Sequence, residues 1–598
     1  MNLVACLKER KKNMSCFKKI IAIVLSFTMI FCMASAGASA SDGVNTEKSE
    51  TSVIDTVSDI FSDVNIFEGV TMEKGFLAAL IKVSMNALNV FAQGLLKGLC
   101  AVYPNPKIWK SYEDFTGENI LDGRADYQTA AADGAQYKLG YSSASLIPED
   151  FEEGKYYMGR QLNVVSFVEG AKAKGIIDDQ RVRVVCVDDG SGKGAVVIAV
   201  IDGIGVTSTT IRNIRAKLAD YVESGKISSI NVSATHCHSA IDTQGVSTSF
   251  LYTLFANAVN NIFGFTEKVE TSYDSFIGNL IDVSAAAIED AYNSMESGKL
   301  YYDKADGSDY IYDKRGLIKD IPPIGILHFV PDSGNDDTYL VNLTCHPTSV
   351  RAKNALVSSD YIYYMDEKFI ENDCNFLMTQ GAVGQLTRED SLLEMDETLG
   401  DLADTTALGY KFAEIVLDAS EDGEEELAPV INVKHTGTNF RTTNYLLQLA
   451  CECRLVDNEV YRTGLGIDDV VLPSEVGYLE FGRRAAFGLY PCEFYPEVFH
   501  GGAVSAEDSW DGKSWDYAPM PDMVDEGIDL YCVCFANDYI GYVVPDNYYA
   551  FLGHIIDLGE DNEFWGKSGV ADECLSAGKN TASQIVECFE GLVESLDK

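Results

Sequence analysis

Two histidines, His236 and His238, stand one residue apart directly after an apolar segment of the chain. The segment Ile227–His236 has the length and composition of a strand, so alternation along it would direct both imidazoles to one side. Imidazole nitrogen is a common zinc ligand, and two imidazoles aimed at one point can bind a metal together. The alternative is that they are hydrogen-bonded polar residues where a strand meets water. The pair by itself leaves both interpretations open.

The same kinds of side chain stand at the ends of other apolar segments. In open α/β sheets, sites form beyond the carboxyl ends of the strands. His346 ends one such segment, Glu493 ends another, and tyrosines 539 and 542 follow a third. Catalytic zinc sites use three protein ligands, with histidine and carboxylate among them, and keep one position open. The strand ends therefore favour a metal site, with solvated polar ends as the alternative.

The elements that must position these residues alternate in type. Ala195–Gly205 predicts a buried strand, Thr207–Gly225 begins with Ser/Thr caps and ends on glycine as helices do, and Ile227–His236 predicts the next strand. A strand, a helix and a strand of these lengths form a parallel βαβ unit. Later, Ile324–Val330 and Thr338–His346 predict a hairpin. We therefore expect one large α/β domain with mixed parallel and antiparallel sheets and flanking helices.

The chain is strongly acidic. Its 598 residues include 46 Lys and Arg against 91 Asp and Glu, which gives a formal net charge of −45 at pH 7. A surface of this charge repels nucleic acid and anionic membranes, so we exclude a DNA- or RNA-binding role. The hydrophobic fraction of 46% is ordinary and is sufficient for a large buried core.

The N-terminus has the three parts of a secretory signal. Lys8–Lys19 is basic, Ile20–Met33 is apolar but short for a membrane span, and the small residues that follow suit cleavage after Ala40. We expect residues 1–40 to be a signal peptide and the mature protein to be secreted. An uncleaved anchor, which would leave the protein at the cell surface, is the alternative.

Residues 41–135 predict an N-terminal extension ahead of the main domain, which we place at residues 136–598. Within the extension, Gly75–Leu99 has apolar residues at helical spacing and contains Lys82 and Lys97. This pattern predicts an amphipathic helix that packs on the main domain. A helix in transient contact with a membrane surface is the alternative, and its low cation content counts against it.

Eight short segments between Tyr137 and Tyr549 carry a further signal. They are LGYSSASLIP, VVIAVIDGIGV, VSATHCHSA, LVNLTCHPTSV, SSDYIYYMDEKF, FLMTQGAVGQLT, LYPCEF and ANDYIGYVVPDNYY. In sequence and in order, these segments resemble the neutral/alkaline non-lysosomal ceramidase family, in its N-terminal catalytic domain. The resemblance rests on the shared order of the segments rather than on any one of them.

The resemblance implies a zinc-dependent hydrolase that cleaves the amide bond of ceramide into a fatty acid and a sphingoid base. Carried over by position, its zinc ligands are His236, His346, Glu493 and Tyr542, with Tyr539 as the alternative to Tyr542. The zinc would activate a water molecule and polarise the carbonyl group. We therefore expect a secreted zinc amidohydrolase that acts on an N-acyl, lipid-like amide.

The resemblance also implies roles around the metal. His238 suits proton transfer or a hydrogen bond to a substrate oxygen. Arg315 matches an arginine that contacts the reacting centre, and Thr387 keeps a hydroxyl where the family has a serine. Tyr539 is the remaining candidate for a catalytic side chain.

Three further acidic residues have open roles. Glu497 competes with Glu493 for the carboxylate position among the metal ligands. Asp202 and Asp360 either hold the imidazoles in place as hydrogen-bond acceptors or cap helices.

Several positions depart from the family pattern. Ala240–Thr243 stands where the family has a Gly-Pro-Gly-Gly turn, and Gln385 replaces an aspartate. The chain also ends too soon after Tyr542 for the family's C-terminal sandwich domain, so we expect none. These departures favour an amide or ester other than ceramide. They also support a second hypothesis, a non-catalytic secreted or surface binding protein on the same metal-binding fold.

Overall fold

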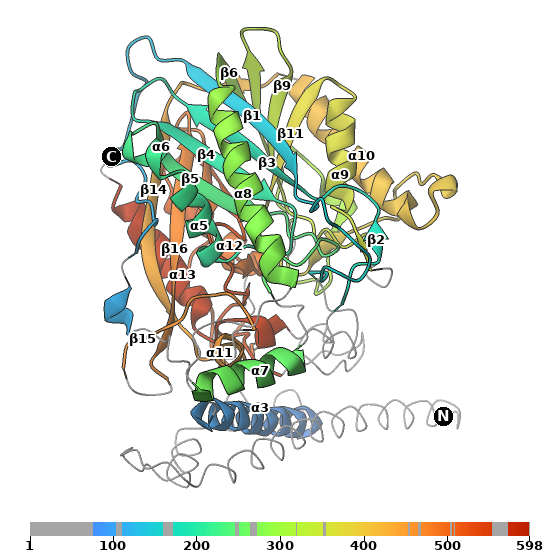
Figure 1. Ribbon diagram of the computed structural model, residues 1–598, viewed down its shortest axis with the longest axis vertical. Coiled ribbons are helices and arrows are strands. Elements are labelled where there is room, and N and C mark those ends of the chain that lie inside the picture. The colour runs from blue at the N-terminus through green and yellow to red at the C-terminus, as the bar shows by residue number, and fades with distance from the viewer. Residues whose placement is uncertain are drawn as a thin grey trace.

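The structure, a computed structural model, shows a mixed α/β fold (Figure 1). It describes residues 76–102, 111–115, 117–159, 171–245, 250–263, 272–318, 320–350, 355–421, 423–452, 455–464, 468–502, 505–507, 509–552 and 572–596. The predicted signal peptide, residues 1–40, lies outside the described residues. The fold class predicted from the sequence is confirmed.

A nine-stranded sheet is the first of two large sheets. Its order is β11-β9-β8-β6-β1-β3-β4-β5, and β13 pairs with β6 beside this path. The pairs β4–β5 and β9–β11 are parallel, and the others are antiparallel. The strands are β1 (Tyr137–Ser145), β3 (Arg181–Asp188), β4 (Ala195–Ile201), β5 (Ile227–Ala234), β6 (Glu296–Ala305), β8 (Ile324–Pro331), β9 (Asp337–Leu343), β11 (Cys374–Gln380) and β13 (Glu425–Glu426).

The predicted βαβ unit is present in this sheet. The parallel neighbours β4 and β5 are connected through α5 (Ser208–Lys217) and α6 (Ala219–Glu223). Helix α5 begins after Thr207, whose side chain accepts a hydrogen bond from the Thr210 amide and so satisfies one free amide of the first turn. The predicted hairpin is present as the antiparallel pair β8–β9.

A second sheet packs face to face against the first. Its order is β14-β16-β17-β19, and β15 pairs with β16 beside this path. Val185 and Leu327 of the first sheet share one buried apolar cluster with Phe487 of the second. The strands are β14 (Ile431–Arg441), β15 (Tyr461–Arg462), β16 (Val470–Phe481), β17 (Ala485–Leu489) and β19 (Asp529–Val533).

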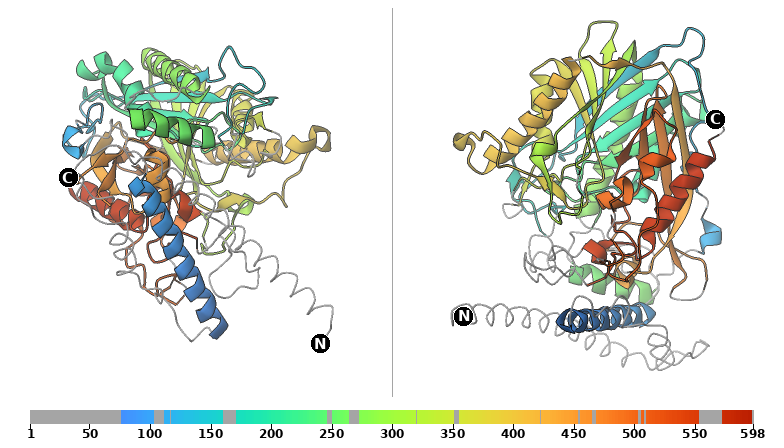
Figure 2. Two further views of the ribbon diagram at one scale, coloured as in Figure 1. Left: turned by 60° about the horizontal axis from the view of Figure 1, so that its bottom comes forward. Right: turned by 180° about the vertical axis from the view of Figure 1, so that it is seen from behind.

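Helices cover the outer faces of both sheets, which gives four layers (Figure 2). Helices α5, α8 (Ser272–Asn293), α9 (Tyr361–Ile370) and α10 (Ala403–Glu421) lie on the first sheet, and α13 (Thr581–Glu594) lies on the second. Strand β8 shows how alternation serves both layers: Ile326 packs with α9 and α10, whereas Leu327 faces the second sheet.

Short strand pairs and further helices complete the described fold. The pairs are β2 (Gly175–Ile176) with β10 (Leu356–Val357), β7 (Ile311–Asp313) with β12 (Leu386–Arg388), and β18 (Glu493–Phe494) with β20 (Tyr542–Val543). The helices are α3 (Phe76–Val102), α7 (Phe250–Phe263), α11 (Tyr445–Glu452) and α12 (Pro496–His500). Helix α3 occupies the region of the predicted amphipathic helix and packs on α11. Within the described residues, no helix combines the length and the apolar character needed to cross a membrane.

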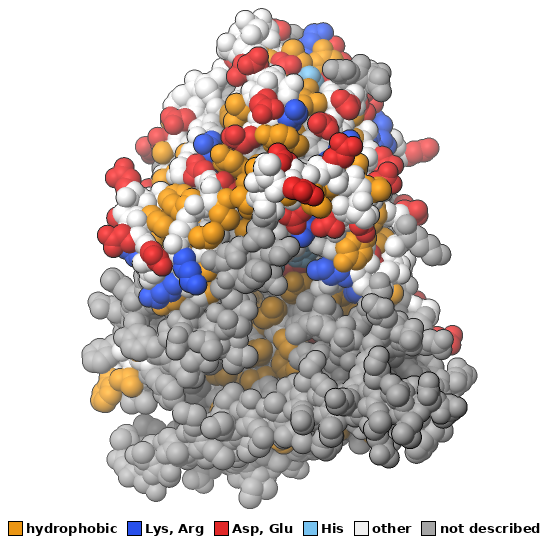
Figure 3. Space-filling view, turned by 90° about the vertical axis from the view of Figure 1, so that its right-hand side faces the viewer, with side chains coloured by type: hydrophobic (Ala, Val, Ile, Leu, Met, Phe, Trp, Pro, Cys, Tyr) orange, Lys and Arg blue, Asp and Glu red, His pale blue; other side chains and the backbone are white. Residues whose placement is uncertain are grey.

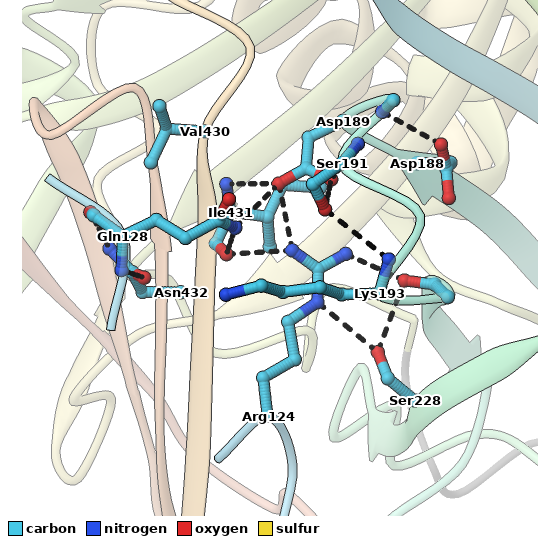
Figure 4. A network of polar contacts seen from close by, with 12 residues as sticks. Arg124, Gln128, Asp188, Asp189, Ser191, Lys193, Ser228, Val430, Ile431 and Asn432 are labelled. Atoms are coloured by element: carbon cyan, nitrogen blue, oxygen red, sulfur yellow. Dashed lines mark hydrogen bonds and ion pairs between the residues drawn. The ribbon is translucent and has the colours of Figure 1, made fainter. Parts of the chain in front are cut away.

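A buried network joins the two sheets ahead of β1 (Figure 4). The Arg124 guanidinium donates to Asp189 Oδ2 at 2.8 Å, to the Ile431 carbonyl at 2.8 Å and to the Gly194 carbonyl at 2.6 Å. Asp189 and Gly194 lie between β3 and β4, and Ile431 begins β14, so one side chain ties both sheets together. Part of the predicted extension therefore packs on the main domain, and the domain boundary at residue 136 stays a prediction.

The segment Cys534–Asn537, which we call the seam, connects the sheets again beyond β19. The Cys534 amide donates to the Gln380 carbonyl of β11 at 2.9 Å, and the Asn537 amide donates to the Val232 carbonyl of β5 at 2.7 Å. Asn537 Oδ1 in turn accepts from the Val232 amide at 3.0 Å. Asn537 has a left-handed φ of 61°, which asparagine tolerates better than most residues. The seam follows β19 of the second sheet in the chain, but its backbone amides bond to β11 and β5 of the first sheet.

We expect Asn537→Ala to lower the free energy of unfolding by about 2 kcal/mol, because alanine loses the Val232 hydrogen bond and disfavours a left-handed backbone. Thermal and denaturant unfolding measure the change. Asn537→Gly is the matched control, since it also loses the acceptor oxygen but tolerates positive φ, and it should lose less. An alanine variant as stable as the wild-type protein would show that the seam does not hold the sheets together.

Candidate metal centre

His236 lies just beyond β5 and is held by a backbone carbonyl. The strand ends at Ala234, and His236 has a left-handed φ of 64°, so the alternation expected to continue through His238 is wrong at this point. The His236 Nδ1 lies 2.7 Å from the Ile204 carbonyl oxygen. A carbonyl can only accept, so Nδ1 carries the hydrogen and Nε2 presents a lone pair.

His346 follows β9 and is held in the same way. Its Nδ1 lies 3.2 Å from the Val383 carbonyl oxygen and 3.3 Å from the Leu386 carbonyl oxygen. These contacts assign the hydrogen to Nδ1 and leave the Nε2 lone pair turned away from them. Burial lowers the pKa of His346 to about 3, so this imidazole is neutral at ordinary pH.

Glu493 faces both imidazoles from the second half of the chain. It begins β18, its side chain is fully buried, and β18 pairs in parallel with β20. Its Oε2 lies 3.2 Å from His236 Nε2, and its Oε1 lies 3.3 Å from His346 Nε2. Burial works to raise the pKa of Glu493, but the neighbouring imidazoles lower it overall below its usual value. The carboxylate is therefore ionised.

The donor set of this centre fits a zinc ion. Two imidazole lone pairs and a carboxylate are all acceptors, so they repel one another unless a cation lies among them. Two ligands of one tetrahedral zinc ion, each about 2.1 Å from it, lie about 3.4 Å apart. The separations of 3.2 and 3.3 Å between Glu493 and the imidazoles are close to that value. His236, His346 and Glu493 could together supply three ligands, the number that the protein provides in catalytic zinc sites.

His238 adjoins this set. Its Nε2 lies 3.1 Å from His236 Nε2, and the ligand nitrogens of His236, His238 and His346 all lie within 4.8 Å of one another. Glu493 contacts two of these imidazoles directly. His238 is only partly buried, unlike His236 and His346, so it is the imidazole of the centre that meets the solvent side.

The two candidate tyrosines differ in their contacts. The Tyr539 hydroxyl donates to Glu493 Oε2 at 3.4 Å, and its ring centre lies 6.3 Å from that of His236. Tyr542 stands beside Glu493 in the β18–β20 pair, and its ring contacts Tyr495. The hydroxyl of Tyr539 is thus directly at the carboxylate, while the ligand role of either tyrosine stays a prediction.

Arg315 and Glu497 form a buried ion pair. The Arg315 Nη2 lies 2.8 Å from both oxygens of Glu497, and its guanidinium stacks over the Tyr495 ring at 3.9 Å. The structure thus separates the two acids that competed in the sequence: Glu493 contacts the imidazoles and Glu497 contacts the arginine. The guanidinium charge is neutralised by Glu497, and the catalytic role of Arg315 stays a prediction.

The remaining candidates lie around the centre. Thr387 is buried on β12, directly after Leu386, whose carbonyl contacts His346. Asp360 caps α9 by accepting from the Tyr361 amide, and Asp202 accepts from Arg183 at 2.8 Å. Each of these two aspartates therefore has a structural partner of its own.

Sequence reasoning missed the groups that orient the imidazoles. The His236 ring stacks on Phe535 of the seam, with 4.2 Å between ring centres and 8° between ring planes. The three carbonyls that fix Nδ1 belong to Ile204, Val383 and Leu386. Backbone carbonyls leave no signature in a sequence, and one phenylalanine among 28 has none either.

The comparisons with known proteins bear on this arrangement. The sequence matches no known protein-family description, and no curated protein matches it. The structure, however, superposes on the neutral ceramidase from Pseudomonas aeruginosa with a TM-score of 0.54 and 15% identity, over 78% of this chain and 75% of that one. The fold is ceramidase-like.

A second solved structure, described as a ceramidase complexed with C2, agrees. Its TM-score is 0.52 at 15% identity, over 77% of this chain and 75% of that one. Identity this low establishes the shared ceramidase-like fold alone. The fold implied by the eight segments is thereby confirmed.

We expect the purified protein to contain about one zinc ion per chain, because three acceptors converge on one point. We expect His236→Ala and His346→Ala each to remove most of it, as measured by elemental analysis after dialysis. His328→Ala is the matched control: this histidine lies on β8 with Glu424 and Asp337, away from the centre, and its loss should leave the zinc in place. A folded wild-type protein that binds no zinc would contradict the assignment.

Glu493→Gln keeps the size of the side chain but removes its charge. We expect zinc affinity to fall by at least about ten-fold, since an anionic oxygen is replaced by a neutral one. Competition against a metal-sensitive dye measures this change. Glu497→Gln, which alters the Arg315 pair instead, should change zinc affinity far less, and equal losses in the two variants would contradict the separation of the two acids.

Proposed function

We propose that this protein is a zinc-dependent hydrolase that cleaves an N-acyl, lipid-like amide. The observation that carries the proposal is the meeting of two buried imidazoles and a buried carboxylate at separations of 3.2 and 3.3 Å. The ceramidase-like fold supports the same reaction class, because the solved structures that share the fold are described as ceramidases. The departures in Ala240–Thr243 and at Gln385 favour an amide other than ceramide.

The residues of the chain would divide the work of amide hydrolysis. A zinc ion held by His236, His346 and Glu493 would supply Lewis acidity and make water a better nucleophile at neutral pH. His238, at the solvent side of the centre, is placed to take the proton from the attacking water and to give it to the leaving nitrogen. The Tyr539 hydroxyl lies at the carboxylate and is placed to donate to the oxygen of the cleaved carbonyl.

The carbonyls behind the imidazoles support this division. Carbonyls hold Nδ1 of His236 and of His346, and the Nε2 of each ring would be bound to the metal, so neither ring would have a free nitrogen to carry the proton. A ring fixed in this way keeps its Nε2 aimed at the metal position. Proton transfer is therefore left to His238.

Export is part of the proposal. It rests on the basic, apolar and small-residue parts of residues 1–40 and places the mature chain outside the cytoplasm, free or at the cell surface. A secreted or surface protein of this kind meets lipid amides in membranes or in the medium.

We expect His238→Gln to lower kcat by about 10²- to 10⁴-fold while bound zinc is retained, because glutamine cannot carry the proton. Release of fatty acid from a panel of N-acyl sphingoid bases, N-acyl amino acids and acyl esters measures the activity, and elemental analysis measures the metal. His346→Ala should lose both the activity and the zinc.

The same panel decides between the proposal and its alternative. A wild-type protein that binds zinc but hydrolyses no member of the panel would favour a non-catalytic binding protein on this fold. Retained activity in His238→Gln would contradict the proton-transfer role. His328→Gln serves as the control for a histidine change outside the centre.

A further inference from the structure

The helix α3 places its charges in an unusual way. Its two lysines face the protein: the Lys82 ammonium is buried, donates to the Ser509 carbonyl at 3.2 Å and lies 5.4 Å from the centre of the Trp510 ring. Lys97 pairs with Asp468 at 2.9 Å. A helix on the surface of a water-soluble domain normally turns its charges outward.

The outward face of α3 is uncharged. Its exposed positions recur at helical spacing, and Phe91 is the largest of them, with 44% of its surface exposed. A side chain added at Gly98 would meet nothing within 4 Å, so the helix is open at this position. The exposed residues are Ser84, Ala87, Phe91 and Ala101. Helix α3 contains no Asp or Glu, in a chain with a net charge of −45.

Helix α7, in turn, is a helix without charged residues. It contains no Asp, Glu, Lys, Arg or His, and Val259 and Phe263 are 49% and 70% exposed. Figures 1 and 2 show α3 and α7 at the same end of the molecule. By contrast, Figure 3 shows acidic side chains scattered over the upper part of another face, between hydrophobic ones.

Both helices are connected with chain segments that lead to or from the metal centre, α7 in the sequence and α3 by packing. Helix α7 follows the loop that begins with His236 and His238. Helix α3 packs against Phe551 and Leu552, in the segment that continues from β20. Helix α7 is thus near the centre in the sequence, and α3 packs on the segment that follows β20.

The net negative charge of the chain limits which partners this surface can bind. A second copy of the chain would bring another net charge of −45 toward the first, and anionic lipids would be repelled in the same way. The lysines that could attract anionic lipids are already paired within the protein. What remains is an apolar partner without net charge, and a zwitterionic bilayer has that chemistry.

We propose that the outward face of α3 seats the protein on an uncharged, zwitterionic lipid bilayer. The helix would lie in the plane of the interface, with Phe91 among the acyl chains and both lysines held by the protein. This binding does not depend on the proposed reaction, although it would bring a lipid amide to the centre.

Phosphatidylcholine vesicles test the proposal with the full chain. We expect tryptophan fluorescence of Phe91→Trp to be quenched by brominated phosphatidylcholine more strongly than that of wild type. Ile370→Trp is the matched control, because Ile370 is 55% exposed at the end of α9, far from α3 in Figure 1. We expect Phe91→Asp to weaken sedimentation with the vesicles by about ten-fold and Ile370→Asp to leave it unchanged.

Three results would overturn the proposal. The first is quenching at position 91 no greater than at position 370, which would mean that any vesicle binding arises elsewhere, for example from Ile20–Met33. The second is binding that requires anionic lipid. Burial of the indole in the Phe91→Trp variant without vesicles, together with a dimer in sedimentation velocity, would assign the surface to a second copy instead. Zinc content and hydrolysis of a short, soluble amide are measured on the same variants, so failure of this surface is distinguishable from failure of the centre.

Discussion

Mutual repulsion of three acceptors is the constraint around which the centre is built. The carbonyls of Ile204, Val383 and Leu386 fix the hydrogens of two imidazoles on Nδ1, so both Nε2 lone pairs are turned toward an ionised Glu493. Such an arrangement is unfavourable unless a positive charge lies within it. The fold must therefore supply enough rigidity to hold the acceptors together, and the proposed metal ion would supply the attraction.

The rigidity comes from two sheets that are joined at more than one place. His236 and His346 extend from strands of the first sheet, whereas Glu493 and Phe535 belong to the chain of the second. The seam carries Phe535 to the His236 ring while its amides bond to β5 and β11. Arg124 joins the same two sheets through Asp189 and the Ile431 carbonyl. The centre is thus a product of sheet packing, and neither sheet alone contains it.

The sequence predicted those features that depend on local pattern. The caps and apolar runs around Thr207 are sufficient to predict the βαβ unit, and strand ends with His, Glu and Tyr were sufficient to point to one site. What failed depends on contacts between distant segments. The left-handed turn at His236 ends the strand alternation early, and nothing near Arg315 in the sequence indicates that Glu497, 182 positions away, neutralises it. The orienting carbonyls are invisible in any sequence.

The pairing of β18 with β20 has a consequence for the order of events during biosynthesis. The first imidazole is made at residue 236, but the carboxylate follows only at residue 493, and its strand has no partner until residues 542 and 543 exist. A ribosome must therefore finish nearly the whole chain before His236, His346 and Glu493 can come together. Binding of the proposed metal ion would accordingly be a late step of maturation, and a chain that crosses a membrane before folding would bind the ion only after export.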